Sequence, residues 1–235
     1  MHKTQTGVLD KFIFLIVGAS GSGKDTLVSN WCKDFDLTKI KSYTTRPKRE
    51  NDVTDCENHT FVTKEEFDKL NDIIAYTSYN GYEYCATSEQ VDNNNFYIVD
   101  PKGILDFKNN YNGNKIPIVV YIDVPEEKRI ERMRNRGDDE NSINNRIKYD
   151  RVSFNNLNLS LIDIDIIIDN SSNLIETRWG DSITLKYGNS ASSWSFAEML
   201  NCFNISTMIT KGIKSENKSI KQMCYCYQPN PNQND

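Results

Sequence analysis

A glycine-rich turn between an apolar run and a helical stretch is the feature that most constrains how this chain folds. The run at 12–17 (FIFLIV) is short, branched and aromatic, and a glycine ends it, so it predicts a buried strand. Residues 24–35 follow with apolar side chains at helical spacing, namely Leu27, Val28, Trp31 and Phe35. A strand, a tight turn and a helix in this order predict an α/β domain.

The turn itself matches the phosphate-loop pattern G-x-x-x-x-G-K, because it runs GASGSGK from Gly18 to Lys24. Its glycines let backbone N–H groups point at phosphate oxygens, and the helix N-terminus adds partial positive charge. We therefore predict a site in which Lys24 bridges the outer phosphates of a bound group. The predicted members of this site are Gly18, Ser20, Gly21, Ser22, Gly23, Lys24, Asp25 and Thr26.

Asp25 departs from the pattern, which usually has Ser or Thr at this place to contact magnesium. An aspartate would either hold the ion through water or repel phosphate and weaken binding. A second carboxylate, Asp100, ends a predicted strand and would either orient a magnesium-bound water or serve as a structural group at the strand end. The residues leave both choices open, and no direct metal ligand from the protein is predicted.

The rest of the predicted sheet and its helices lie between residues 96 and 169. Apolar runs at 96–100 (FYIVD) and 118–123 (IVVYID) predict interior strands, and 164–169 (IDIIID) predicts the last one. The stretch 124–137 is a predicted helix, with a proline and two glutamates in its first turn and a glycine after it. A second helix is predicted over 142–154.

The character of the sequence changes after residue 170. We predict one domain over 1–170 and a C-terminal extension over 171–235, whose role the sequence leaves open. Within the extension, 177–188 is strand-like and 195–203 is helix-like, while the polar end at 228–235 is typical of disorder.

Composition limits the classes of function. A net charge of -5 argues against a nucleic-acid surface, and no apolar run approaches the roughly 20 residues that span a bilayer. The N-terminus lacks the apolar core of a signal peptide. The six cysteines are scattered and only two histidines are present, which favours free thiols in a reducing cytoplasm over a zinc site. We expect a cytoplasmic protein whose partner is a small phosphorylated molecule; the oligomeric state stays open.

A second cationic motif, KSYTTRPKREND at 41–52, contains Lys41, Arg46, Lys48 and Arg49 within an acidic protein. Arginine suits phosphate because its guanidinium donates two hydrogen bonds in a fixed plane. The motif therefore predicts a second phosphate-binding region.

Taken with the loop, this motif resembles the guanylate kinase family, and the resemblance extends over about residues 12–170. The family pattern S-x-T-T-R-x-x-R is matched by Ser42, Thr44, Thr45, Arg46 and Arg49. His59 (in HTF) stands where the family has its first tyrosine, and Tyr84 (in GYEYC) matches the second. The resemblance implies that the acceptor phosphate is held by Ser42, Arg46, Arg49, His59 and Tyr84, with Asp100 also in the substrate site.

The family also has a lid with three arginines, matched here by Arg132, Arg136 and Arg146. The first two are four residues apart and so share one helical face, from which they are expected to converge on one anion. The resemblance implies that the three close over the transferring group. It implies a three-layer P-loop kinase fold with a parallel central sheet, a small acceptor-binding insertion and a helical lid.

Two positions at which the family recognises guanine are changed. The family's glutamate is replaced by Ala75 and its serine by Ala86, so two donors of the base would lack partners at about 1–3 kcal/mol each. Glu83 and Asp72 lie nearby in sequence and would be possible substitutes.

The resemblance implies phosphoryl transfer that depends on ATP and Mg²⁺, with GMP or dGMP as the first expected acceptor. Three alternatives remain open. One is another (deoxy)nucleoside monophosphate. The second is ribose 1,5-bisphosphate, because kinases of that sugar keep a similar loop, often with GKD. The third is a non-catalytic binding module of the guanylate-kinase-like type.

Overall fold

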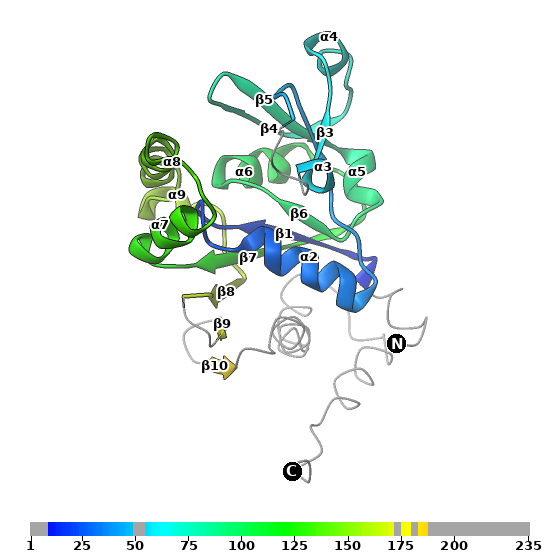
Figure 1. The fold of residues 1–235 in the computed structure, drawn as a ribbon. Helices are drawn as coiled ribbons and strands as arrows, with labels where there is room; N and C mark the ends of the chain where they lie inside the picture. Colours follow the sequence, from blue (N-terminus) through cyan, green and yellow to red (C-terminus); the bar gives the residue numbers. More distant parts are fainter. Residues whose placement is uncertain (1–8, 49–54, 172–174, 180–182, 188–235) are drawn as a thin grey trace, which may run out of the picture.

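The computed structural model describes residues 9–48 and 55–171, together with the backbone of 175–179 and 183–187 (Figure 1). Its strands are β1 (Phe12–Val17), β2 (Ser42–Thr44), β3 (His59–Phe61), β4 (Ile73–Tyr79), β5 (Tyr82–Thr87), β6 (Phe96–Ile98), β7 (Ile116–Asp123), β8 (Ile166–Asp169), β9 (Ile175–Trp179) and β10 (Ile183–Tyr187). Its helices are α2 (Lys24–Phe35), α3 (Asp55–Asn58), α4 (Lys64–Phe67), α5 (Ser88–Asp92), α6 (Pro101–Asn110), α7 (Glu126–Asn135), α8 (Glu140–Ser153) and α9 (Asn156–Ser160).

The main sheet has the strand order β10-β9-β8-β7-β1-β6. Strands β6, β1, β7 and β8 run parallel, while β9 and β10 are antiparallel additions at one edge. Strand β1 lies in the middle of the parallel part, where Phe14 pairs with Phe96 on one side and Ile118 on the other. The predicted parallel central sheet is confirmed. The loop that follows β1 lies at the carboxyl end of this sheet's parallel strands.

Both faces of this sheet are covered, which explains why β1 is apolar at every position. Alternate residues Phe12, Phe14 and Ile16 pack in the cluster that contains Trp31 of α2. The intervening residues of β1 pack on the opposite face, in the cluster that contains Ile104 and Phe107 of α6. The molecule therefore has the predicted three layers, with α2 and α6 on opposite faces of the sheet (Figure 1).

Replacing Trp31 with alanine is expected to lower the free energy of unfolding by about 3–5 kcal/mol. The indole is fully buried, and its ring centroid lies 5.8 Å from that of Phe96. Chemical denaturation followed by circular dichroism would measure the change. Trp31→Phe is the matched control, because it keeps an aromatic ring in the same space and should cost much less. An equal loss in both variants would contradict a packing role.

A second, smaller sheet has the order β3-β2-β5-β4 and forms the predicted insertion. It lies beyond α6, away from α2, while the lid helices α7 and α8 lie at another side of the main sheet (Figure 1). Its hairpin between β4 and β5 turns at Asn80 and Gly81, which have φ angles of 53° and 79°. Asn-Gly with two positive φ angles is the turn that best matches the twist of paired strands.

Element boundaries differ from the predictions where side chains cap helices. Strand β6 ends at Ile98 because the Asp100 side chain accepts a hydrogen bond from the Gly103 amide and begins α6, a helix that was not predicted. Asp139 caps α8 in the same way, so this helix begins at Glu140 rather than 142. The strand-like stretch 177–188 contains part of β9 and all of β10, and β9 pairs with β8. The sheet thus continues past residue 170, while 195–203 and 228–235 lie outside the described residues.

Candidate active site

The loop between β1 and α2 has a backbone that demands glycine at two places. Gly21 and Gly23 have φ angles of 78° and 83°, in the left-handed region. A Cβ on Gly21 would lie 2.6 Å from the carbonyl oxygen of Arg129, and one on Gly23 would lie 2.7 Å from Nδ2 of Asn170. The loop is therefore tightly enclosed by α7 and by the end of β8.

The loop also has the features expected of a phosphate cradle. The hydroxyl of Ser22 is fully buried and has no hydrogen-bond partner within the described part of the chain. Burying a hydroxyl without a partner is costly, so an oxygen-rich ligand at this place would satisfy it. Lys24 begins α2, and its Nζ lies 3.8 Å from the carboxylate of Asp25, which is half-exposed. The residues present fit a bound polyphosphate.

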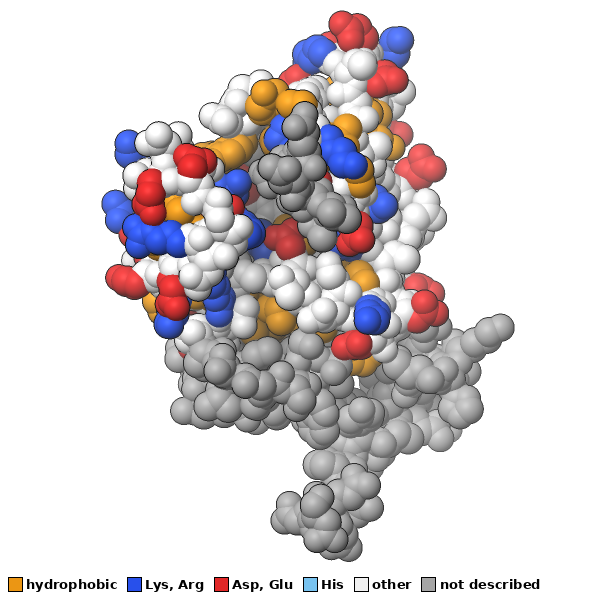
Figure 2. Space-filling model, viewed as in Figure 1, with side chains coloured by type: hydrophobic (Ala, Val, Ile, Leu, Met, Phe, Trp, Pro, Cys, Tyr) orange, Lys and Arg blue, Asp and Glu red, His pale blue; other side chains and the backbone are white. Residues whose placement is uncertain are grey.

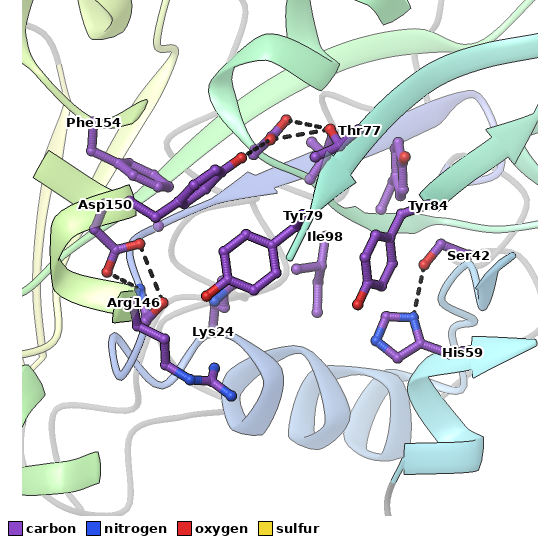
Figure 3. Close-up of a pocket in the computed structure, with 16 residues that line it drawn as sticks. Lys24, Ser42, His59, Thr77, Tyr79, Tyr84, Ile98, Arg146, Asp150 and Phe154 are labelled. Atoms are coloured by element: carbon purple, nitrogen blue, oxygen red, sulfur yellow. Dashed lines mark hydrogen bonds between the residues drawn. The ribbon is translucent and has the colours of Figure 1, made fainter. Parts of the chain in front are cut away.

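Two cavities flank the loop. The first, of about 270 Å³, is here called the tyrosine-lined cavity (Figure 3). It is lined by Gly18, Ser20, Lys24, Ser42, His59, Thr77, Tyr79, Tyr84, Tyr97, Ile98, Val99, Asp100, Arg146, Tyr149, Asp150 and Phe154. The second, of about 380 Å³, is called the arginine-lined cavity. It is lined by Gly21, Gly23, Thr26, Leu27, Arg132, Met133, Arg136 and Asn170.

Three predicted acceptor residues meet in the tyrosine-lined cavity, each from a different strand of the insertion. Oγ of Ser42 (β2) lies 2.9 Å from Nδ1 of His59 (β3), and the imidazole contacts the ring edge of Tyr84 (β5) at 5.7 Å between centroids. Figure 3 shows the three side chains together at one end of the cavity. Parallel pairing of β2 with β3 places Ser42 beside His59, which explains the contact.

Arg46 lies just behind this group instead of lining the cavity. Its guanidinium donates two hydrogen bonds to Asp55, at 3.0 and 2.6 Å, and only 9% of the residue is exposed. Burial opposes its charge, but the hydrogen bonds and charges of Asp55 and Tyr84 outweigh burial and raise the pKa of Arg46. Arg46 thus hydrogen-bonds Tyr84, which itself lines the cavity. Arg49, predicted beside it, lies outside the described residues.

Asp100 faces the tyrosine-lined cavity with its carboxylate already occupied by donors. It accepts hydrogen bonds from the Gly103 amide at 2.7 Å, from the Thr77 hydroxyl at 3.1 Å and from the Tyr149 hydroxyl at 3.1 Å. Burial, followed by the charge of Asp100, raises the pKa of Tyr149 to about 12, so this tyrosine remains a donor at neutral pH. These contacts favour the structural interpretation of Asp100, which links β6, β4 and the lid helix α8.

The two alanines at the predicted guanine-contacting positions are buried and do not line the cavity. Ala75 and Ala86 are 1% and 0% exposed, pair with each other across β4 and β5, and pack in the core. Glu83 is paired with Lys64 at 2.6 Å and accepts from the Tyr76 hydroxyl. Neither Glu83 nor Asp72 lines the cavity. The structure therefore gives no support to either as a substitute acceptor.

The three predicted lid arginines are divided between the two cavities. Arg132 donates to the carbonyl oxygens of Ser22, at 3.3 Å, and Asn170, at 2.6 Å, and with Arg136 it lines the arginine-lined cavity. Arg146 comes from α8 and extends into the tyrosine-lined cavity (Figure 3). Arg132 and Arg136 are brought together, as their spacing predicts. Arg146 lies on the other side of the loop.

Two charged residues in the site were not predicted. Arg129 and Asp150 form an ion pair of 2.9 Å, with side chains 9% and 4% exposed. Each stands at a position that helical spacing assigns to a buried face, since Met133 follows Arg129 by four residues, and Ile143 and Ile147 precede Asp150 by seven and three. The sequence signal that could have identified them is a charged residue at a position where the helix otherwise carries apolar residues.

Comparisons with known proteins identify the family. A family model described as guanylate kinase matches residues 11–177. The chain belongs to the guanylate kinase family. The guanylate kinase of Neisseria gonorrhoeae is 39% identical over 83 residues, which are 34% of this chain and 40% of that protein. The guanylate kinase of Bartonella henselae is 31% identical over 152 residues, or 60% of this chain and 67% of that one.

A third relative, the guanylate kinase of Mycoplasma genitalium, is 29% identical over 155 residues, or 60% of this chain and 63% of that one. The chain thus spans about 40 to 67% of the length of these guanylate kinases. A crystal structure of guanylate kinase from Anaplasma phagocytophilum matches 93% of this chain and 98% of that one, with a TM-score of 0.49 and 15% identity. That likeness is too weak to argue from, and family membership rests on the sequence model.

The described residues contain no group of three or more His, Cys, Asp or Glu side chains that would hold a metal ion. None of the described helices combines the length and apolar character that crossing a bilayer requires.

Proposed function

We propose that this chain transfers the γ-phosphoryl group of ATP, with magnesium, to a nucleoside monophosphate, with GMP or dGMP as the first acceptor. The observation that carries the proposal is the position of Lys24 and the glycine-rich loop between two cavities in a guanylate kinase-family chain. One cavity has hydroxyl and imidazole groups from the insertion, and the other has two arginines. This arrangement suits a donor on one side of the loop and an acceptor on the other.

On the donor side, the Gly18–Lys24 loop would hold the β- and γ-phosphates of ATP. The unpartnered hydroxyl of Ser22 supports this assignment. Thr26 lines the arginine-lined cavity together with Arg132 and Arg136, which would contact the donor nucleotide. Magnesium bound with the phosphates would offset their charge, and the exposed carboxylate of Asp25 would contact the ion through water.

On the acceptor side, Ser42, His59 and Tyr84 would hold the acceptor phosphate, with Arg46 supplying charge from behind Tyr84. Lys24 and Arg146 line the same cavity and would offset charge on the transferring group. Phosphoryl transfer asks mainly for positioning and charge neutralisation. The chain supplies both without a covalent intermediate.

A second candidate acceptor is favoured by the burial of Ala75 and Ala86. Both alanines lack a side-chain acceptor and pack in the core, and the Asp100 carboxylate already accepts from Gly103, Thr77 and Tyr149, so none of these three positions offers a free acceptor to a guanine edge. Such an arrangement suits another base, or ribose 1,5-bisphosphate, which has no base. A binding module without catalysis is less well supported, since the loop residues Gly18 and Ser20, together with Lys24 and Arg146, all line the same cavity.

The test is an acceptor panel with the purified full chain, ATP and Mg²⁺. ADP release would be measured with GMP, dGMP, the other nucleoside monophosphates and ribose 1,5-bisphosphate. Release with GMP or dGMP would support the first proposal, and release with the sugar alone would replace it with the second. Binding of ATP without release on any acceptor would contradict kinase activity on this panel. The expected cytoplasmic location, and the absence of nucleic-acid and membrane partners, stay predictions from composition.

Replacing His59 with phenylalanine is expected to raise KM for the acceptor about three- to tenfold, because the ring remains but its hydrogen bond with Ser42 is lost. KM for ATP should stay unchanged, since His59 lines only the tyrosine-lined cavity of the two. Steady-state kinetics with each substrate varied in turn would measure both constants. His59→Tyr, which restores the family residue, is the control and should retain acceptor binding. A change confined to KM for ATP would contradict this role.

A further inference from the structure

We infer that the buried ion pair Arg129–Asp150 is a positioning device that sets the shape of the phosphate loop from the lid helices. The inference rests on the proposed function only in taking the loop to hold nucleotide phosphates. Arg129 belongs to α7 and Asp150 to α8, and their charged atoms lie 2.9 Å apart.

The pair engages every polar group of one loop residue, Ser20. Its amide donates to Oδ2 of Asp150 at 2.9 Å, and its hydroxyl donates to Oδ1 at 3.2 Å. Its carbonyl oxygen accepts from Nη1 of Arg129 at 3.2 Å. Because N–H, C=O and side chain are all fixed, Ser20 has little freedom to rotate. Ser20, predicted to contact the nucleotide, acts instead as the point where the loop is anchored.

The pair is itself held firmly, which a positioning role requires. Nε of Arg129 donates to the carbonyl oxygen of Val124 at 3.2 Å, so the guanidinium is fastened to the end of β7. Asp150 is 3% exposed, and its backbone follows Tyr149, whose hydroxyl contacts Asp100. Figure 3 shows Asp150 at the lid end of the cavity with two dashed hydrogen bonds at its carboxylate, which are those donated by the Ser20 amide and hydroxyl.

Stability alone is a poor explanation for these charges. A buried ion pair carries a desolvation cost that its attraction often fails to offset, and apolar residues of similar size commonly serve as well. The ion pair touches a loop in which small displacements matter, since a shift of about 1 Å in a positioned group can lower a reaction rate about 10²-fold. Gly21, the next residue, is packed against the backbone of Arg129, so a shift of α7 would move the loop directly.

The test uses the full chain and its affinity for ADP with Mg²⁺, measured by isothermal titration calorimetry. The main variant is the double substitution Arg129→Met with Asp150→Leu. It removes both charges together, and so avoids leaving one buried charge unpaired. We expect the dissociation constant for ADP to rise about 10- to 100-fold, because the loop loses the charge-assisted hydrogen bonds that preorganise it for phosphate. Asp150→Asn, which keeps one carbonyl oxygen as an acceptor for Ser20, should show a smaller rise.

The matched control removes the ion pair Arg134–Glu140, which joins α7 and α8 at 2.6 Å on their exposed side. Basic and acidic side chains alternate over this outer face of the lid (Figure 2). Arg134→Met with Glu140→Leu should leave ADP affinity unchanged. Thermal melting of each variant separates loss of fold from loss of positioning.

A folded double variant that binds ADP within about twofold of the unmodified chain would overturn the inference. If the double variant does not fold, unchanged ADP affinity in Asp150→Asn overturns it instead. Failure of the proposed function is distinguishable, because ADP binding needs no acceptor. If no acceptor gave turnover but the variants bound ADP more weakly, the proposed kinase activity would be refuted. The positioning role of the ion pair would still be supported. An unmodified chain that bound no ADP would refute both.

Discussion

Replacing Lys24 with alanine is expected to lower turnover by about 10²- to 10³-fold while leaving the fold intact. Lys24 begins α2 directly after the glycine-rich loop, and its side chain lines the tyrosine-lined cavity. Among the residues that the structure describes, no other lysine lines either of the two cavities beside the loop. In the proposed mechanism, its ammonium would offset charge on the transferring group. ADP release in a coupled assay, with the best acceptor of the panel, measures the loss.

The matched control is Lys33→Ala, in the last turn of the same helix, where the side chain is exposed. This variant should retain the turnover of the unmodified chain. Circular dichroism melting should show both variants folded. Unchanged turnover in Lys24→Ala would refute the proposed mechanism, because the loop would then hold phosphate without its main positive charge.

Replacing Arg146 with alanine should also lower turnover, by about 10²- to 10³-fold, with a smaller effect on KM for ATP. Arg146 extends from the lid helix into the cavity that Lys24 also lines, whereas Arg132 and Arg136 line the cavity on the other side of the loop. Because the arginines line different cavities, we expect their substitutions to change different kinetic constants. Arg146→Ala should act mainly on kcat, and Arg132→Ala mainly on KM for ATP. Steady-state kinetics with both substrates varied would separate these effects.

Arg151→Ala provides the control for Arg146. It removes an arginine of the same helix whose exposed side chain pairs with Glu126 and lines neither cavity. Its kinetics should match those of the unmodified chain. If Arg146→Ala and Arg132→Ala raised KM for ATP equally and left kcat unchanged, the assignment of Arg146 to the transferring group would be wrong.

Most of the predicted fold follows from local patterns. The apolar run of β1 and the amphipathic face of α2 have the bounds predicted, 12–17 and 24–35, because hydrophobic periodicity and glycine signals agree there. Helix α6 was missed because its start depends on Asp100 turning from a strand end into a helix cap. From the sequence alone, a carboxylate after a strand cannot be identified as the last strand residue or as the cap of the next helix.

The site was predictable as a set of residues but not as an arrangement. The order of motifs along the chain marked Lys24, Ser42, His59 and Tyr84, and these meet in one cavity. The family resemblance implied that all three lid arginines close over one transferring group, yet Arg146 lines one cavity and Arg132 and Arg136 line the other. Helical spacing fixes which residues share a face, whereas the direction of that face depends on how α7 and α8 pack against the loop.

The amino-acid sequence by itself determined the phosphate loop with its flanking strand and helix, because these depend on residues close together in the chain, and the order of its motifs indicated the guanylate kinase family. Only the tertiary structure decided what Ser20, Arg129 and Asp150 do. These residues are up to 130 positions apart, and the hydrogen bonds that unite them exist only when α7 and α8 pack beside the loop. Short-range patterns specify elements; packing over long sequence separations specifies which polar groups meet.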